Sequence, residues 1–198
     1  NFSKIDFIFE FKKDELSLDN FKLSLNGTDL EISKLKAKKI KKDFQISGKL
    51  SNKQQLFYKK EIIELFDNDI FKYPINRINF SSENLFSFEI DNKLKFKNFK
   101  FDSKFNVKEL ILINEFELDK FFPNLEKEII LTNHKINFQY NKDTWSLKGM
   151  GDFLIKNKDK VEYNFKKKGK NIFFNTLLKI NESPFKIDFF NYQKNETS

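Results

Sequence analysis

Residues 136–147 read Ile-Asn-Phe-Gln-Tyr-Asn-Lys-Asp-Thr-Trp-Ser-Leu. Apolar and polar side chains alternate on both sides of Asn141-Lys142-Asp143, a sequence typical of a tight turn. Because successive side chains of a strand point to opposite faces of a sheet, each half of the stretch predicts a strand with one apolar and one polar face. The short turn then joins the two strands in an antiparallel hairpin.

The same alternation recurs along most of the chain, and short turn signals such as Asn26-Gly27 and Lys168-Gly169-Lys170 separate the runs. Because parallel crossovers need a dozen residues or more, these short connections favour strands that pair with their sequence neighbours. We therefore predict a mainly β protein, a long antiparallel meander that forms a twisted, curved sheet or groove. The other alternating runs are 5–11, 21–25, 30–32, 44–46, 78–80, 86–90, 94–96, 99–101, 105–107, 153–155, 161–165, 174–180 and 185–189.

Three segments depart from this pattern. Residues 53–66 carry apolar side chains at helical spacing and predict one amphipathic helix. Residues 118–124 predict a short helical turn that is ended or redirected at Pro123. Between Phe96 and Phe99 the apolar phase slips by one residue, and a bulge or turn near Asn98 would restore the apolar face.

The domain organisation follows from the absence of any Pro/Gly-rich or low-complexity linker. We expect residues 1–198 to form a single β-rich segment, with a candidate sub-division near 67–76, where the alternation is lost. The chain begins at Asn1 without an initiator Met or signal-like segment, which we interpret as a piece cut from a longer protein.

Composition excludes several classes of protein. The 198 residues contain 27 phenylalanines and no cysteine, which leaves no disulfide scaffold, thiol nucleophile or Cys-based metal site. No apolar run approaches the roughly 18 residues that a membrane-spanning helix needs. The net charge is +8, but the bias toward Phe, Lys, Asn and Ile is also typical of an AT-rich genome, so the charge is a weak guide to function.

We find no catalytic constellation in the sequence. His134, the only histidine, alternates with Ile136 and Phe138, which is typical of a structural strand residue. Gly149-Met150-Gly151 starts like a phosphate-binding loop, but Leu154 stands where the third glycine should be, so a bulge or a close backbone contact explains it better. We therefore predict no catalytic residues, no metal ligands and no cofactor, and hence a protein that is not an enzyme.

Two basic segments, 34–42 and 166–170, have two interpretations. They would suit the phosphates of nucleic acid or of lipid headgroups, or they are the solvated face and tip of hairpins, where lysine also protects sheet edges. The second interpretation is favoured. Because nucleic-acid recognition relies on arginine and the chain has only Arg77, we expect no nucleic-acid partner, and a basic binding module remains the weakest functional alternative.

The aromatic face is the most informative feature. One helix and one helical turn are too little to cover the apolar side of so long a sheet, which predicts a trough suited to acyl chains. Its mechanism would be passive burial, with headgroups in water and lysines near the rim. The alternative is a purely structural β-sandwich spacer of a surface or scaffold protein, with every Phe internal. The candidate lining residues are Phe7, Phe9, Phe88, Phe101, Phe138, Phe153 and Phe165.

Six segments of the chain share a further pattern: 22–33, 44–50 with the helix after it, 95–107, 120–123, 145–155 and 187–194. In these segments the chain resembles the repetitive, β-rich periplasmic part of the AsmA-like family of long bacterial envelope proteins. The resemblance implies a hydrophobic groove and a role in phospholipid transport or homeostasis between the inner and outer membranes. It also implies a periplasmic location in the cell envelope and an inner-membrane anchor upstream, which this chain lacks. The implied partners are a phospholipid or other acyl-chain lipid and neighbouring β segments of the same parent chain; no catalytic residues carry over.

Overall fold

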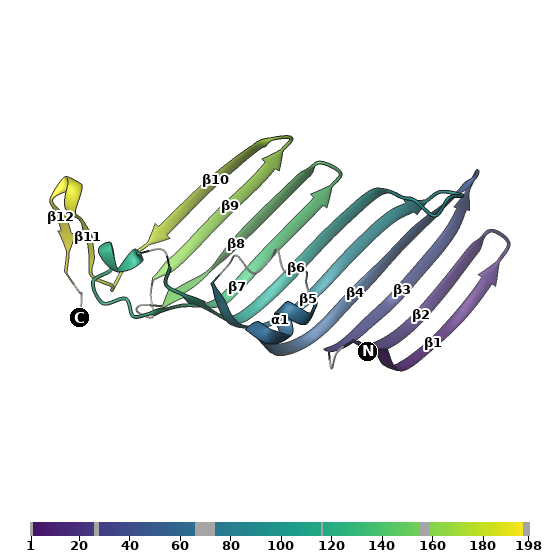
Figure 1. Ribbon diagram of the computed structural model, residues 1–198, viewed down its shortest axis with the longest axis horizontal. Helices are drawn as coiled ribbons and strands as arrows, with labels where there is room; N and C mark the ends of the chain where they lie inside the picture. The colour runs from purple at the N-terminus through teal and green to yellow at the C-terminus, as the bar shows by residue number, and fades with distance from the viewer. Residues whose placement is uncertain (1, 26–27, 66–73, 116, 155–158, 196–198) are drawn as a thin grey trace.

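A computed structural model describes residues 2–25, 28–65, 74–115, 117–154 and 159–195, without the side chains of 2–7, 25, 28, 64–65 and 154. Ten strands form one antiparallel sheet in sequence order, and the first and last strands do not pair (Figure 1). This confirms the predicted meander. The strands are β1 (Phe2–Lys12), β2 (Glu15–Leu25), β3 (Thr28–Ile40), β4 (Asp43–Tyr58), β5 (Ile75–Ile90), β6 (Phe96–Ile113), β7 (Glu128–Asn141), β8 (Thr144–Leu154), β9 (Lys160–Lys168) and β10 (Asn171–Lys179).

Tight turns join alternate pairs of strands along one edge of the sheet, the upper edge in Figure 1. Lys41, Lys142 and Gly169 begin three of these turns with φ near +57° (56°, 58° and 59°), the left-handed backbone that a two-residue hairpin needs. The turns predicted at 141–143 and 168–170 are thus confirmed, whereas Asn26-Gly27 lies outside the described residues. We call this edge the hairpin rim (residues 10–16, 38–44, 89–97, 140–144 and 166–173) and the opposite edge the loop rim (29–30, 59–63, 74–76, 114–128, 159–160 and 179–195).

Asparagines in left-handed backbone interrupt three strands. Asn20, Asn98 and Asn133 have φ of 55°, 54° and 55°, a conformation that asparagine tolerates better than most residues. The pairing of β5 with β6 shifts between Ser87 and Glu89, opposite Asn98, which confirms the predicted bulge. Because a bulge bends its strand and increases the local twist, these positions contribute to the curvature of the sheet.

The helix is shorter than predicted. Residues 53–58 belong to β4, and only α1 (Lys59–Leu65) is helical, so the prediction of a helix over 53–66 is wrong for its first half. The physical reason is that Phe57 is buried on the sheet, with its ring centroid 5.3 Å from that of Phe80 on β5. The helix begins where the Tyr58 amide donates to the Glu61 carboxylate at 2.6 Å.

The remaining elements lie at the loop rim. The helical turn predicted over 118–124 is a 3-10 turn, η2 (Leu118–Lys120), followed by a non-helical turn at Pro123. Beyond β10, the short strands β11 (Phe185–Ile187) and β12 (Tyr192–Lys194) flank the 3-10 turn η3 (Asp188–Phe190). Residues 67–73 of the candidate sub-division near 67–76 lie outside the described residues; β4 and β5 on either side of them are neighbours in the sheet.

Candidate functional site: an apolar trough

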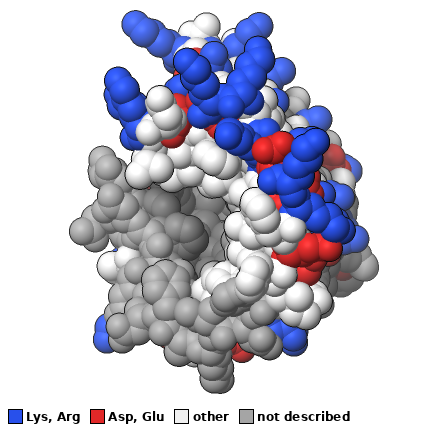
Figure 2. Space-filling model, turned by 90° about the vertical axis from the view of Figure 1, so that its right-hand side faces the viewer, with Lys and Arg blue, Asp and Glu red and all other residues white. Residues whose placement is uncertain are grey.

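The candidate site is the face of the sheet that its curvature turns inward. Direct cross-strand pairing joins Phe86 to Phe101, Phe101 to Tyr140 and Tyr140 to Trp145 on one face. Since directly paired residues share a face, this row defines an inner face across β5 to β8. Figure 2 looks along the sheet and shows a hollow whose upper and right-hand borders are uncharged residues, with lysines and carboxylates outside them. We call the hollow the trough.

Aromatic rings form a nearly continuous lining of the trough. The ring centroids of Phe88 and Phe99 are 6.5 Å apart, those of Phe99 and Tyr140 5.7 Å, and those of Phe101 and Phe138 6.2 Å. Such separations are within the range of favourable aromatic contact. Phe96 would lie on the outer face without the bulge at Asn98, because it is an odd number of residues from Phe99 and Phe101; the bulge returns it to the inner face, where it pairs with Ile90.

Five of the predicted lining residues lie on the inner face toward the hairpin rim. Phe9 is exposed on β1, and Phe88, Phe101, Phe138 and Phe165 are half-buried on β5, β6, β7 and β9. Their partial exposure is what an open trough requires, because a closed sandwich would bury them.

The other two candidates differ. Phe7 lies in β1, but its side chain is outside the described residues. Phe153 is on the inner face of β8 but is only 6% exposed, because the ring of Phe122 lies across it at 5.3 Å. Phe122 and Phe153 belong to a packed cluster with Ile129 and Val161, which we call the covered corner. Phe153 therefore packs against protein and does not line the open trough.

Glycines let rings lie flat on the floor of the trough. A Cβ atom added to Gly149 would come within 2.4 Å of the Tyr163 ring, and one added to Gly151 within 2.1 Å of the His134 ring. The close backbone contact predicted for Gly149-Met150-Gly151 is thus present, and neither glycine tolerates a side chain without displacing a ring.

A polar band crosses the apolar floor, and sequence reasoning missed it. Ser82 and Ser103 donate to the side-chain oxygens of Asn52 and Asn84, while the Asn84 amide donates to Ser82 at 2.8 Å and to the Leu50 carbonyl at 3.1 Å. Ser82, Asn84 and Ser103 are buried. Because their hydrogen bonds are made to one another, the band is internally satisfied and needs no polar ligand. Its only sequence signal is serine and asparagine at apolar-phase positions of alternating strands.

The buried His134 and the half-buried Tyr163 form a second polar group on this face. His134 Nδ1 lies 3.1 Å from the Tyr163 hydroxyl, and Nε2 lies 3.2 Å from the Asp152 carbonyl oxygen. Since a carbonyl only accepts, Nε2 carries the proton and the Tyr163 hydroxyl donates to Nδ1. Burial lowers the pKa of His134 and raises the pKa of Tyr163 to about 12, so both groups are neutral at physiological pH. This arrangement fits the structural role predicted for His134.

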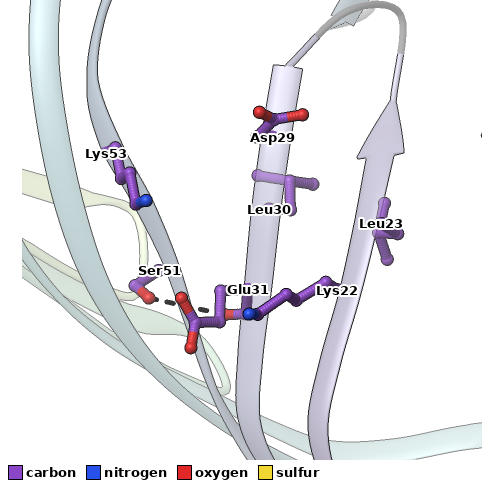
Figure 3. A pocket seen from close by; sticks show the side chains of 7 residues that line it. All are labelled: Lys22, Leu23, Asp29, Leu30, Glu31, Ser51 and Lys53. Atoms are coloured by element: carbon purple, nitrogen blue, oxygen red, sulfur yellow. Dashed lines mark hydrogen bonds between the residues drawn. The ribbon is translucent and has the colours of Figure 1, made fainter. Parts of the chain in front are cut away.

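The outer face carries hollows of a different chemistry. One, of about 330 Å³, lies between β2, β3 and β4, and five of its seven lining residues are polar or charged (Figure 3). Lys22, Glu31 and Lys53 are among them, and the Ser51 hydroxyl donates to the Glu31 carbonyl at 3.4 Å. A lining of charges that are also open to water does not suit an acyl chain, so the trough is the better candidate site.

Within the described residues, no group of three or more His, Asp or Glu side chains is placed to hold a metal ion. Nor is any described helix long and apolar enough to cross a membrane. No family model, curated protein or solved structure matches the chain.

Proposed function

We propose that this chain is a non-enzymatic segment of an AsmA-like envelope protein whose aromatic trough shields lipid acyl chains. In this role it supports phospholipid transport or homeostasis between the inner and outer membranes, on the periplasmic side. The observation that carries the proposal is the half-buried aromatic row from Phe88 to Phe165, which faces a hollow in a sheet that does not close. An apolar surface of this extent normally marks a ligand site.

The dimensions suit an acyl chain. Ten strands at about 4.8 Å spacing make a trough about 43 Å long. One leaflet contributes roughly half of the 30 Å hydrocarbon core of a bilayer, so a lipid tail fits within the trough along its length. Each methylene removed from water contributes about 0.8 kcal/mol without directional demands. Passive burial is thus sufficient to bind an acyl chain. Because the polar band is internally satisfied, binding needs no fixed contact with the headgroup.

Two lysines stand where the trough meets water. Lys39 pairs across strands with Phe44, and Lys167 pairs with Trp145, so each lysine begins at the edge of the inner face at the hairpin rim. An ammonium group at this edge suits the phosphate of a lipid whose tail lies on the aromatic rings. Long lysine side chains reach water from such positions while their methylenes remain on apolar surface.

Site-specific photocrosslinking tests the proposal. We expect p-benzoylphenylalanine in place of Phe101 or Phe138 to give lipid adducts by mass spectrometry after purification from membranes. The same group at Lys100 or Gln139, the neighbours on the same strands that face outward, is the matched control. Equal adducts at inner and outer positions, or none at either, with no uptake of a fluorescent phospholipid, would contradict a lipid-binding trough.

The covered corner favours one alternative, a structural spacer in which protein fills the rest of the trough as Phe122 fills the corner. In that case the crosslinker at Phe101 would attach to polypeptide instead of lipid. The masses of the adducts therefore distinguish the two functions in one experiment.

A further inference from the structure

The two rims of the trough differ in charge. Within its described residues, the hairpin rim carries fourteen lysines and seven carboxylates, whereas the loop rim carries eight lysines and ten carboxylates. Figure 2 shows lysines gathered along the top of the molecule, which is the hairpin rim. Most of the net charge of +8 is thus concentrated on one long edge of the molecule.

The lysines gather at two hairpin tips. The β3–β4 tip carries Lys38, Lys39, Lys41 and Lys42, and the β9–β10 tip carries four more within 166–170. None of these eight forms an ion pair with another described residue, and all but one are exposed. Six strand spacings of about 4.8 Å place the tips about 29 Å apart.

Between these tips, the β5–β6 hairpin presents apolar side chains to water. Leu94 is 78% exposed and Phe96 is 71% exposed. Leu94 also has a φ of 59°, a backbone conformation that costs a leucine energy and that glycine or asparagine adopts more readily. Neither burial nor turn preference explains a leucine at this position.

The tip that carries Leu94 is held rigidly. One carboxylate oxygen of Asp91 accepts the backbone amides of Lys93 at 2.9 Å and Lys95 at 3.0 Å. Two backbone hydrogen bonds, from the Leu94 amide to the Asp91 carbonyl and from the Asp91 amide to the Lys95 carbonyl, close the loop. The Lys95 amide and the Lys97 ammonium, both bound to the carboxylate, lower the pKa of Asp91. The loop therefore presents Leu94 outward between two lysines at fixed positions.

Other exposed apolar side chains stand on the same rim, among them Phe11, Phe44, Ile172 and Phe173. Lysines in unpaired clusters beside exposed aromatic and aliphatic side chains fit the interface of an anionic bilayer, where phosphates and the first methylenes lie together. A nucleic acid would use the lysines but would leave Leu94 without a partner.

We infer that the hairpin rim docks on the surface of an anionic lipid bilayer. Leu94 and Phe96 insert among the headgroups, and the lysine tips on either side contact acidic lipids. This goes beyond the proposed function, because the partner is a bilayer and the site is an edge, not the trough. Docking in this way lays the trough along the bilayer surface.

Vesicle flotation of the 198-residue chain tests the inference. We expect binding to phosphatidylcholine vesicles that contain phosphatidylglycerol, loss of binding at high salt, and little binding to phosphatidylcholine alone. Replacing Lys38, Lys39, Lys41 and Lys42 together by glutamine should weaken binding at least about tenfold. Replacing four lysines of the loop rim by glutamine should change it less than about twofold; these are Lys59, Lys60, Lys120 and Lys127.

The insertion of Leu94 into the bilayer is tested separately, by fluorescence. Because the chain has no cysteine, Leu94→Cys carries the only thiol for an environment-sensitive fluorophore. We expect a blue shift of its emission on anionic vesicles and no shift for the same label at Glu126→Cys on the loop rim. Circular dichroism of each variant shows that the sheet is retained.

Several results would overturn the inference: equal binding to neutral and anionic vesicles, equal loss in the two lysine variants, or an unshifted label at position 94. Salt-sensitive retention of a duplex oligonucleotide without vesicle binding would also overturn it. Crosslinking to lipid at Phe101 needs no vesicles, so docking and the trough fail or succeed independently.

Discussion

Phe153 and Phe174 lie on the same face of the same sheet, yet one is 6% exposed and the other 75%. Phe153 is near the loop rim under Phe122, whereas Phe174 is on the edge strand β10, with the ring of Phe165 beside it at 6.4 Å. Every buried hydrophobic residue in the described part of the chain lies in the loop-rim half of the molecule. The alternation of polar and apolar residues thus assigns a side chain to a face of the sheet, but the burial of that side chain depends on which other segments pack against the face.

Two segments cover the loop-rim half of the inner face. The segment around η2 supplies Phe122, and the segment after β10 supplies Ile180 and Phe185. Asp159, which is almost completely buried, holds the second of these segments: its carboxylate accepts the amides of Asn181 at 2.7 Å and Glu182 at 3.0 Å. Within the described residues, no comparable segment covers the half of the inner face that lies near the hairpin rim.

The largest expected effect on the free energy of unfolding comes from replacing the two phenylalanines just compared. Phe153→Ala should lower the free energy of unfolding by about 3–5 kcal/mol, because it leaves a cavity beneath Phe122. Phe174→Ala should lower it by less than about 1 kcal/mol, since the ring is already in water. Urea unfolding followed by circular dichroism measures both, and equal losses would contradict the division into covered and open halves.

Asp159→Ala should uncover the corner. Removing the carboxylate takes the acceptor from the amides of Asn181, Glu182 and the buried Ser183, and we expect a loss of roughly 2–3 kcal/mol. Hydrogen exchange should accelerate in residues 180–185 before it does in the strands. Asp188→Ala is the control, because its carboxylate makes an exposed pair with Lys186 at 3.5 Å; a similar loss there would show that the effect is not specific to the corner.

Acid should lower the free energy of unfolding through His134, whose ring stacks on Tyr163 between the covered and the open half of the inner face. Because burial lowers the pKa of His134 in the folded protein, the unfolded chain binds a proton first as the pH falls below 6.5. Stability from this group is complete well above pH 6.5, and we expect it to be lost progressively as the pH falls through 6.5 toward the lower pKa of the folded protein.

Urea unfolding at pH 7.5 and 5.5 measures this loss. His134→Gln should be less stable at both pH values but should show little further loss between them. A wild-type protein that is equally stable at both pH values would contradict a neutral, buried His134.

The smallest effect concerns the curvature of the open half. Asn98→Ala should cost about 1 kcal/mol, because alanine tolerates a φ of 54° poorly. Asn98→Gly should cost less, since only the 2.7 Å hydrogen bond to the exposed Glu89 carboxylate is lost. Thermal unfolding compares the two, and an alanine variant as stable as the glycine variant would argue against a strained bulge.

Several features of the trough could be predicted because they are local. The strands, the turns at 141–143 and 168–170 and the bulge at Asn98 follow from polarity and turn chemistry within a few residues. The start of α1 could not, since helical spacing over 53–66 competes with pairing of the same residues to β5. The polar band was missed for a similar reason: Asn52, Asn84 and Ser103 are far apart in sequence and meet only through register.

By itself, the sequence determined which side chains share a face, because the polarity of a strand repeats every two residues whatever surrounds it. It also determined the charge of the hairpin tips, which are short stretches of consecutive residues. The tertiary structure alone decided which half of the aromatic face is covered. Phe122 reaches Phe153, and Asp159 holds the segment at Ser183, only after ten strands have paired and brought distant parts of the chain to one corner.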